Sequence, residues 1–172
     1  MTEQKIAVKQ FNERDKDQII SLPYYNILLL EGAGEVSVDY NHSVLLTYTL
    51  LFATPYQEIL IKGGNTFIIT QLTFHGDFYC IEYHKEEVAC NGLLFNNIYL
   101  KPFLSIPENQ YRALKNDVEC IDQLLKEHDP YAEPIIKAYL QLILAKASRL
   151  KIKDLDKGIQ LQRQRHPIEK FQ

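Results

Sequence analysis

The amino-acid sequence predicts a mainly-β fold: a sandwich or barrel of short strands, followed by an antiparallel pair of helices. In the first hundred residues, short apolar or alternating runs are separated by Gly, Pro and Asn turns, without the helices of about 10–15 residues that a parallel βαβ sheet needs. After Pro107, apolar residues recur every three or four positions, which is the period of a helix face. With 172 residues, 46% of them hydrophobic, the chain can build the core of one domain.

The first part of the chain is expected to hold strands at residues 24–30, 35–40, 44–46, 49–54, 58–61 and 66–74. Gly32 and Gly34 indicate a hairpin turn with a positive φ between the first two strands. They do not indicate a dinucleotide-binding loop, because a strand follows them where that loop requires a helix. Further turns are expected at Asn41-His42 and at residues 62–65.

Two helices are expected, at residues 108–127 and 131–150, with Asp129-Pro130 separating them. Each helix has one apolar stripe, and we expect the two stripes to form a dimer interface: Tyr111, Leu114, Val118, Ile121 and Leu125, then Ile136, Leu140, Ile143, Ala147 and Leu150. The second helix is also apolar at Ile135, Tyr139, Leu142 and Leu144. A face this wide indicates burial on two sides, against the barrel and against another helix or subunit.

Gly158 is expected to end the second helical segment, and HPIEKF at 166–171 resembles the opening of a further helix. Residues 151–172 are therefore interpreted as a linker and the start of a following domain. This segment is rich in Lys and Arg. We interpret these residues as the solvated face of a linker, with a phosphate-binding arm as the alternative.

Composition and charge exclude several classes of protein. The longest apolar runs are only a few residues, too short for a membrane span, and the N-terminus lacks the features of a signal peptide. Three cysteines without CxxC spacing suggest free thiols in a reducing compartment, so we expect a soluble cytoplasmic protein. Residues 1–105 hold 7 basic and 12 acidic groups, a net charge of −5, which makes this part a poor nucleic-acid binder.

The sequence makes no positive case for an enzyme. It contains no GxSxG motif, no phosphate-cradling loop and no pair of carboxylates placed as an acid–base couple. The one candidate metal cluster is His75, Cys80, His84 and Cys90, whose spacing matches no standard zinc pattern. The alternative is two half-buried thiols and two ordinary surface histidines. We expect no cofactor.

A small barrel can enclose one small ligand, and the even-numbered strand residues are expected to face inward together. They form an apolar lining with a few hydroxyl and amide groups, which is typical of a small-molecule pocket: Tyr24, Asn26, Leu28, Val36, Val38, Tyr40, Phe52, Thr54 and Tyr56. A fully packed core with tyrosines at the rim is the alternative, and the sequence leaves both open. The polarity of this set favours a neutral or weakly polar compound.

Three segments follow one another before the two helices and HPIEKF: YYNILLLEGAGEVSVDY, TLLFATPYQ and FHGDFYCIEYHKEEVACNGLLFNNIYL. This succession resembles the N-terminal sensor half of AraC/XylS-family transcription regulators with a cupin-type domain. The similarity covers about residues 18 to 172. It implies a cupin-like double-stranded β-helix (jelly-roll) barrel at 1–105 that binds a small effector, and a helical pair at 106–150 that forms a homodimer. It also implies a linker at 151–172, leading to a C-terminal DNA-binding domain with two helix-turn-helix units that this chain does not include. We therefore expect a piece trimmed from a longer bacterial protein.

The sequence departs from the metal-binding cupin pattern. Where that pattern has its histidines and glutamate, the resemblance places Ile20, Leu22 and Asn26, and the later histidine falls near Ile59. Aliphatic side chains cannot bind a cation, so the resemblance does not imply a metal in the barrel. Two alternatives stay open: a metal-dependent cupin-type enzyme that uses the His75–Cys90 cluster, and an interaction module without a ligand.

Overall fold

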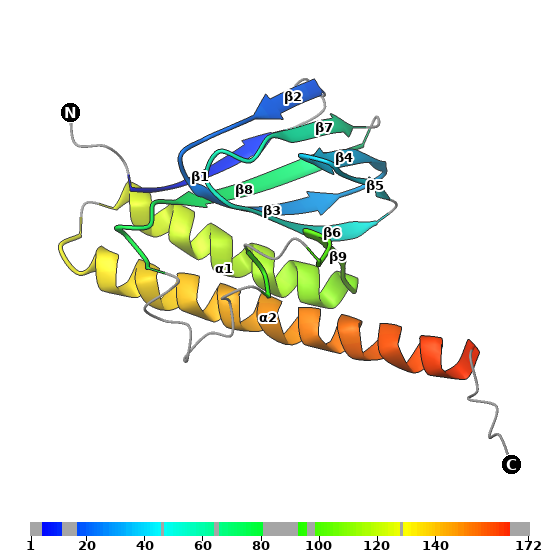
Figure 1. Ribbon diagram of the computed structural model, residues 1–172. Helices are drawn as coiled ribbons and strands as arrows, with labels where there is room; N and C mark the ends of the chain where they lie inside the picture. Colours follow the sequence, from blue (N-terminus) through cyan, green and yellow to red (C-terminus); the bar gives the residue numbers. More distant parts are fainter. Residues whose placement is uncertain are drawn as a thin grey trace, which may run out of the picture.

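The computed structural model describes residues 5–11, 17–45, 47–63, 66–80, 93–95, 99–127 and 129–165. Within these residues a β-rich part precedes two helices, as the sequence predicted (Figure 1). The strands are β1 (Ile6–Phe11), β2 (Asp17–Ile20), β3 (Tyr25–Glu31), β4 (Gly34–Val38), β5 (Asn41–Leu45), β6 (Tyr48–Ala53), β7 (Ile59–Gly63), β8 (Ile68–Phe74) and β9 (Phe103–Ser105). The helices are α1 (Glu108–Lys126) and α2 (Ala132–Arg165).

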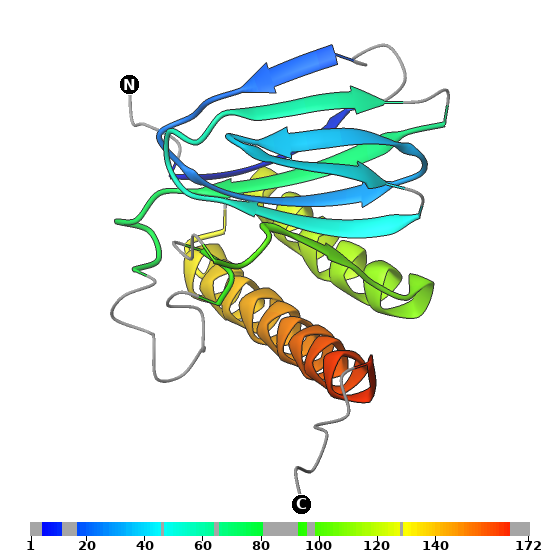
Figure 2. The same cartoon turned by 45° about the vertical axis from the view of Figure 1, so that its right-hand side comes forward.

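The strands form two antiparallel sheets that pack face to face (Figure 2). The five-stranded sheet has the order β1-β8-β3-β6-β9, and the four-stranded sheet has the order β2-β7-β4-β5. The consecutive strands β3 and β4 lie in different sheets, so the turn at Gly32 crosses between the sheets and is not the hairpin that we predicted. Its φ of 109° is positive, as predicted, and an added Cβ would lie 2.8 Å from the carbonyl oxygen of Thr66, so only glycine fits here.

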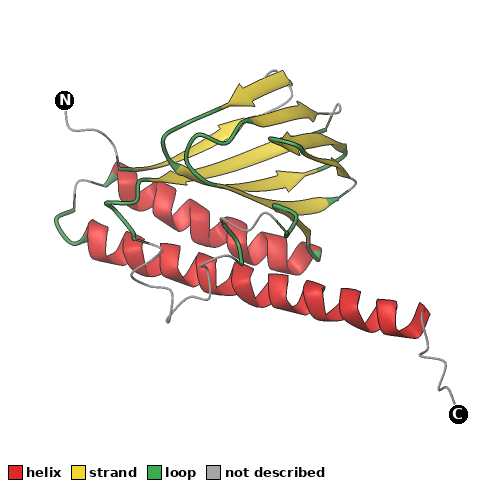
Figure 3. Ribbon diagram, in the orientation of Figure 1, coloured by secondary structure: helices red, strands yellow, loops and turns green. Residues whose placement is uncertain are grey.

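The five-stranded sheet is buried on both faces. In β3, Leu28 and Leu30 pack between the two sheets, whereas Ile27 and Leu29 pack against the helices. This double burial explains why β3 is a continuous apolar run and not an alternating one. The five-stranded sheet is therefore the middle layer of the molecule, between the four-stranded sheet and the helix pair (Figure 3).

The two predicted helical stripes cover this sheet. Tyr111, Leu114, Val118 and Ile121 of α1 and Ile136, Leu140, Ile143 and Ala147 of α2 are at most 4% exposed, and Leu125 and Leu150 pack partly buried against the same cluster. The expectation that these side chains face a second subunit is therefore wrong, because they cover the apolar outer face of the chain's own sheet, which includes Phe52, Leu72 and Phe74.

Helix α2 runs for 34 residues and includes most of the segment that we predicted to be a linker. Gly158 lies inside the helix and does not end it. One exposed glycine costs a helix only about 1 kcal/mol, which a long helix tolerates. Figure 1 shows the last turns of α2 extending past the start of α1. Residues 166–172, with the HPIEKF segment, lie outside the described residues.

Three strands, β1, β2 and β9, were not predicted, and one predicted turn is displaced. β1 pairs with β8 at one edge of the five-stranded sheet, and β9 pairs over three residues with β6 at the other. The turn expected at Asn41-His42 lies at Asp39 and Tyr40, because Asp39 takes the positive φ of 49° and β5 begins at Asn41. Neither α1 nor α2 has the length and apolar character that crossing a membrane requires.

Candidate functional site

Four of the predicted pocket residues lie in the space between the two sheets. Leu28, Val36 and Val38 belong to one hydrophobic cluster with side chains of both sheets, and each is at most 1% exposed. Asn26 is buried beside them, where its side-chain oxygen accepts a hydrogen bond of 2.7 Å from Gln71 and its amide donates to the carbonyl of Tyr24. These residues therefore pack into a core in which the side chains of Asn26 and Gln71 are bonded to each other.

The even-numbered residues of the strands do not all face inward, which corrects our expectation for three others. Leu28 pairs with Leu51 across β3 and β6, so the odd-numbered residues of β6 face the sandwich interior and Phe52 faces the helices. Tyr40 and Tyr56 lie in turns and are 103% and 75% exposed. Tyr24 is half-buried, with its ring 6.0 Å from that of His75.

A cavity of about 620 Å³ lies at one end of the sandwich, and we call it the end cavity. Three predicted pocket residues line it, namely Tyr40, Phe52 and Thr54. The rest of its lining comes from the turn at 39–41, from Gln57 and from the segments 93–95 and 100–102. Its walls combine apolar groups, such as Phe52 and Phe95, with amide, hydroxyl, carboxylate and ammonium groups, as small-molecule pockets do.

Hydrogen bonds hold one rim of the end cavity. The two carboxylate oxygens of Asp39 accept from the side chain of Gln57, at 2.8 Å, and from the backbone N–H of Glu58, at 2.9 Å. Gln57 in turn accepts from the backbone N–H of Thr54. Asp39 and Tyr56 both have a positive φ, which side chains other than glycine adopt rarely, so the fold holds this rim in an unusual backbone conformation.

Three polar side chains of the end cavity are available to a ligand. Within the part of the chain that the structure describes, the side chains of Asn41, Thr54 and Lys101 make no hydrogen bond or ion pair. They offer an amide, a hydroxyl and an ammonium group beside an aromatic wall. Neither Asn41 nor Lys101 was predicted to line a pocket. Asn41 was assigned to a turn, and residues 93–102 have no periodic pattern that would place their side chains.

The wall of the end cavity is tied to α2 by a buried lysine. Lys151 is only 3% exposed, and its Nζ donates to the carbonyl oxygens of Lys101, at 2.7 Å, and Phe103, at 3.3 Å. Burial lowers the pKa of Lys151, while nearby Asp154 opposes that shift. Pro102, between the two acceptors, accepts from the backbone N–H of Phe52. The segment that closes the cavity therefore connects β6 to α2.

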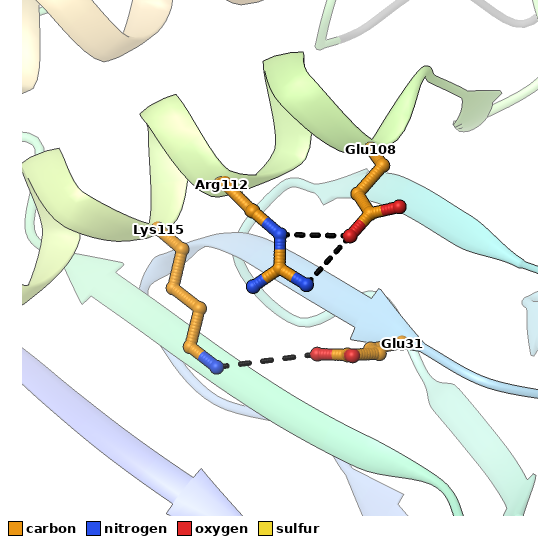
Figure 4. Close-up of polar contacts among 4 residues, drawn as sticks. All are labelled: Glu31, Glu108, Arg112 and Lys115. Carbon is orange, nitrogen blue, oxygen red and sulfur yellow. Dashed lines mark hydrogen bonds and ion pairs between the residues drawn. The ribbon is translucent and has the colours of Figure 1, made fainter.

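A second polar cluster joins α1 to the five-stranded sheet (Figure 4). Arg112 donates to Glu108 one turn earlier, and the Nζ of Lys115 lies 4.0 Å from the carboxylate of Glu31, at the end of β3. Nearby, the Tyr111 ring lies 4.7 Å from that of Tyr48. Burial raises the pKa of Tyr111, and the carboxylate of Glu31 raises it further. The charged side chains of this cluster pair with one another, whereas the buried hydroxyl of Tyr111 has no hydrogen-bond partner among the described residues. We interpret the cluster as the polar attachment of α1.

Within the described residues, no three His, Cys, Asp or Glu side chains come together as metal ligands would. His75 uses its Nδ1 to accept the backbone N–H of Asp77, and Cys80 is exposed. His84 and Cys90 lie outside the described residues, so the proposed cluster is not tested as a whole. Ile20, Leu22 and Ile59, at the positions of cupin metal ligands, pack into the cluster between the sheets.

The sequence matches no protein-family model and no curated protein, but its fold matches solved structures. An apo ToxT variant from Vibrio cholerae matches with a TM-score of 0.54 and 14% identity, over 86% of this chain and 57% of that one. ToxT from Vibrio cholerae bound to (E)-4-(8-methylnaphthalen-1-yl)but-3-enoic acid matches with a TM-score of 0.51 and 11% identity, over 87% of this chain and 58% of that one. The AraC-like transcriptional activator CuxR matches with a TM-score of 0.49 and 13% identity, over 82% of this chain and 52% of that one.

The chain spans a little over half the length of the ToxT chains that it matches. The part of ToxT that it matches is the N-terminal part, which confirms the predicted resemblance in structure. The chain has the cupin-like fold of the N-terminal regulatory domain of AraC-family transcription regulators.

Proposed function

We propose that this chain is the effector-sensing part of a cytoplasmic, bacterial AraC-type transcription regulator and acts on a C-terminal DNA-binding domain. The observation that carries the proposal is the end cavity, a space of about 620 Å³ with apolar walls and three available polar side chains, in a fold like that of ToxT. The net charge of −5 on residues 1–105 disfavours DNA binding by the β-rich part itself. DNA binding then belongs to the other domain.

The lining of the end cavity defines the chemistry of the effector. Asn41, Thr54 and Lys101 favour a small organic molecule with oxygen acceptors, and Phe52 and Phe95 favour one with an apolar part. Lys101 adds a cation that our predicted pocket lacked, so a carboxylate fits as well as a neutral group. ToxT has been crystallised with a carboxylic acid of this general kind, which supports the proposal.

The relay is expected to run through the segment 100–105 and α2. An effector that touches Leu100 or Lys101 contacts the segment whose carbonyls Lys151 holds. An effector shifts a conformational equilibrium only when it binds the two states with different affinity. The bond between Lys151 and this segment makes the position of α2 depend on how the cavity wall is arranged, and α2 leads toward the C-terminus.

Homodimerisation is proposed through the outer face of α2, in place of the buried stripes. Ile135, Leu142, Ile152 and Ile159 are between 42% and 49% exposed. Together with Ala138, Ala145, Arg149 and Asp156 they recur at intervals of three and four residues, and we call these eight residues the outer stripe. Such spacing is typical of a helix face that packs against a second helix. The outer stripe is therefore the surface we expect a second copy to cover.

The test of the effector proposal is a thermal-unfolding screen of the full chain with sugars, amino acids, phenols and carboxylic acids, including the naphthyl-butenoic acid named above. A bound compound at a hundredfold excess over its Kd adds about 2.7 kcal/mol of stability, which raises Tm by several degrees. Thr54→Phe fills the cavity and abolishes the shift, whereas Thr54→Ser, which keeps the hydroxyl, retains it. A shift that Thr54→Phe leaves unchanged, or a panel without any shift, contradicts the assignment of the end cavity.

A further inference from the structure

A second cavity, separate from the end cavity, lies where α2 passes β9 and the start of α1. It has a volume of about 410 Å³ and shares no lining residue with the end cavity. Leu104, Ile106 and Leu150 supply apolar lining, and Arg149, Lys153 and Lys157 supply positive charge. We call it the basic groove. All of its lining residues belong to the part of the chain that the structure describes.

The charges of the basic groove are only partly compensated. Lys146, at one end, is neutralised by Asp117, 2.6 Å away. By contrast, within the described residues Arg149, Lys153 and Lys157 form no ion pair or side-chain hydrogen bond, and Asp154 is the one acidic residue in the lining. Arg149, Lys153 and Lys157 follow one another at intervals of four on α2, so they lie along one side of the helix. Three cations face one carboxylate, and the groove attracts an anion.

The opposite wall adds further donors. The first turn of α1 lines the groove through Pro107, Asn109 and Gln110. Pro107 occupies the N-cap position and provides no side-chain acceptor, so the helix itself leaves the backbone N–H groups of Glu108 and Asn109 without a partner, whereas that of Gln110 donates to the carbonyl of Pro107. The positive end of the helix dipole favours an anion at the same place. This wall reinforces the charge of Arg149, Lys153 and Lys157 but does not by itself define a site.

We propose that the basic groove binds a small organic anion: a carboxylate or a phosphate monoester carried on a short apolar chain. The anionic head contacts Lys153 and Lys157 of α2, and the apolar chain packs on Leu104, Ile106 and Leu150. Such a ligand contacts the connection between β9 and α1 on one side and residues 149–157 of α2 on the other. It therefore fixes the position of α2 relative to the sheet, independently of whether the end cavity is occupied.

The proposal is tested by titrating the full chain with hexyl phosphate and with hexanoate, followed by amide chemical shifts and by calorimetry. The amides of residues 104–110 and 146–157 are expected to shift, and the more tightly bound of the two compounds identifies the preferred head group. Hexanol, which has the same chain without charge, is expected to bind at least about tenfold more weakly. Raising NaCl from about 0.1 M to about 1 M weakens binding of the anions, because the screening length falls from about 10 Å to about 3 Å.

Two variants separate the groove from general attraction to a charged protein. Lys153→Gln with Lys157→Gln removes two exposed cations and is expected to weaken hexyl phosphate or hexanoate binding at least about tenfold. Lys62→Gln, an exposed charge change on β7, leaves the affinity unchanged. The proposal is overturned if neither anion binds at millimolar concentration, if hexanol binds as well as the anions, or if the double variant binds like the wild type. Shifts confined to residues 39–57 also overturn it, since they place the compound in the end cavity.

Discussion

Lys151 is a charged side chain that the fold keeps buried to hold two backbone carbonyls. Burying an ammonium group is costly unless hydrogen bonds compensate, and here the carbonyls of Lys101 and Phe103 supply them. From the sequence alone, Lys151 was one of several basic residues in a segment that we interpreted as a solvated linker. Its position in the helix, facing the cavity wall, separates it from Lys153 and Lys157, which are exposed.

Lys151→Met is expected to lower the free energy of unfolding by about 1 kcal/mol at neutral pH, because two backbone carbonyls lose their donor. Burial lowers the pKa of Lys151 below its ordinary value of 10.5. Between the lowered pKa and 10.5 the unfolded chain binds more protons than the folded chain, so this residue makes stability rise with pH over that window. In Lys151→Met this contribution to the rise of stability with pH is absent. Urea unfolding at a series of alkaline pH values measures the difference between the variant and the wild type.

Lys157→Met is the control for this prediction, since Lys157 is exposed on the same helix. It should leave stability within about 0.5 kcal/mol of the wild type at every pH. Equal pH profiles for the wild type and Lys151→Met would show that Lys151 keeps its ordinary pKa in the folded chain.

At the scale of elements, α2 has two apolar faces with different roles. The inner face, with Ile136, Leu140 and Ile143, covers the five-stranded sheet, whereas the outer stripe stays exposed. From the sequence, this helix was predicted to be apolar on two sides and to have two partners. The predicted dimer interface was placed on the stripe that the chain's own sheet covers, because periodicity shows that a stripe exists but not which neighbour covers it.

Leu142→Glu with Ile152→Glu is expected to convert a dimer into a folded monomer, because it places four carboxylates in the interface of two copies. Sedimentation at tens of micromolar protein measures the oligomeric state, and circular dichroism verifies the fold. Leu114→Lys or Ile143→Lys should instead unfold the chain, since both positions are at most 1% exposed within one copy.

Leu161→Glu provides the matched control, because Leu161 is 56% exposed on α2 but lies off the outer stripe. This variant should remain dimeric. A wild-type chain that sediments as a monomer, or a Leu161→Glu chain that dissociates as readily as the double variant, argues against the outer stripe as the interface.

At the scale of the whole molecule, the helices complete the core of the β-rich part. One continuous hydrophobic cluster contains Ile27, Leu29 and Phe74 of the five-stranded sheet together with Leu114 and Leu140 of the helices. The predicted boundary between a barrel at 1–105 and a helical pair at 106–150 thus passes through a shared core. The two parts are distinct in secondary structure, but we expect them to fold as one unit.

A fragment of residues 1–105 is therefore expected to be unfolded or aggregated, because it exposes the outer face of the five-stranded sheet to water. The full chain should unfold in a single transition, with the same midpoint by far-ultraviolet circular dichroism and by tyrosine fluorescence. A 1–105 fragment that is monomeric and unfolds cooperatively would show that the β-rich part is an independent domain.

The sequence by itself determined the order of the six strands β3 to β8 followed by two helices, and the positive φ at Gly32. These follow from local properties: the spacing of apolar residues, the turn residues, and the steric freedom of glycine. The tertiary structure alone decided which side chains share a site. Whether the even-numbered or the odd-numbered residues of a strand face inward changes from strand to strand. Phe52 therefore lies on the opposite face from Leu28, although both are even-numbered. A strand that is buried on both faces shows no alternation of apolar and polar residues, so its sequence does not reveal which side chains face inward. The end cavity combines residues between 39 and 57 with the segments 93–95 and 100–102, and these are brought together only when the sheets and α2 pack.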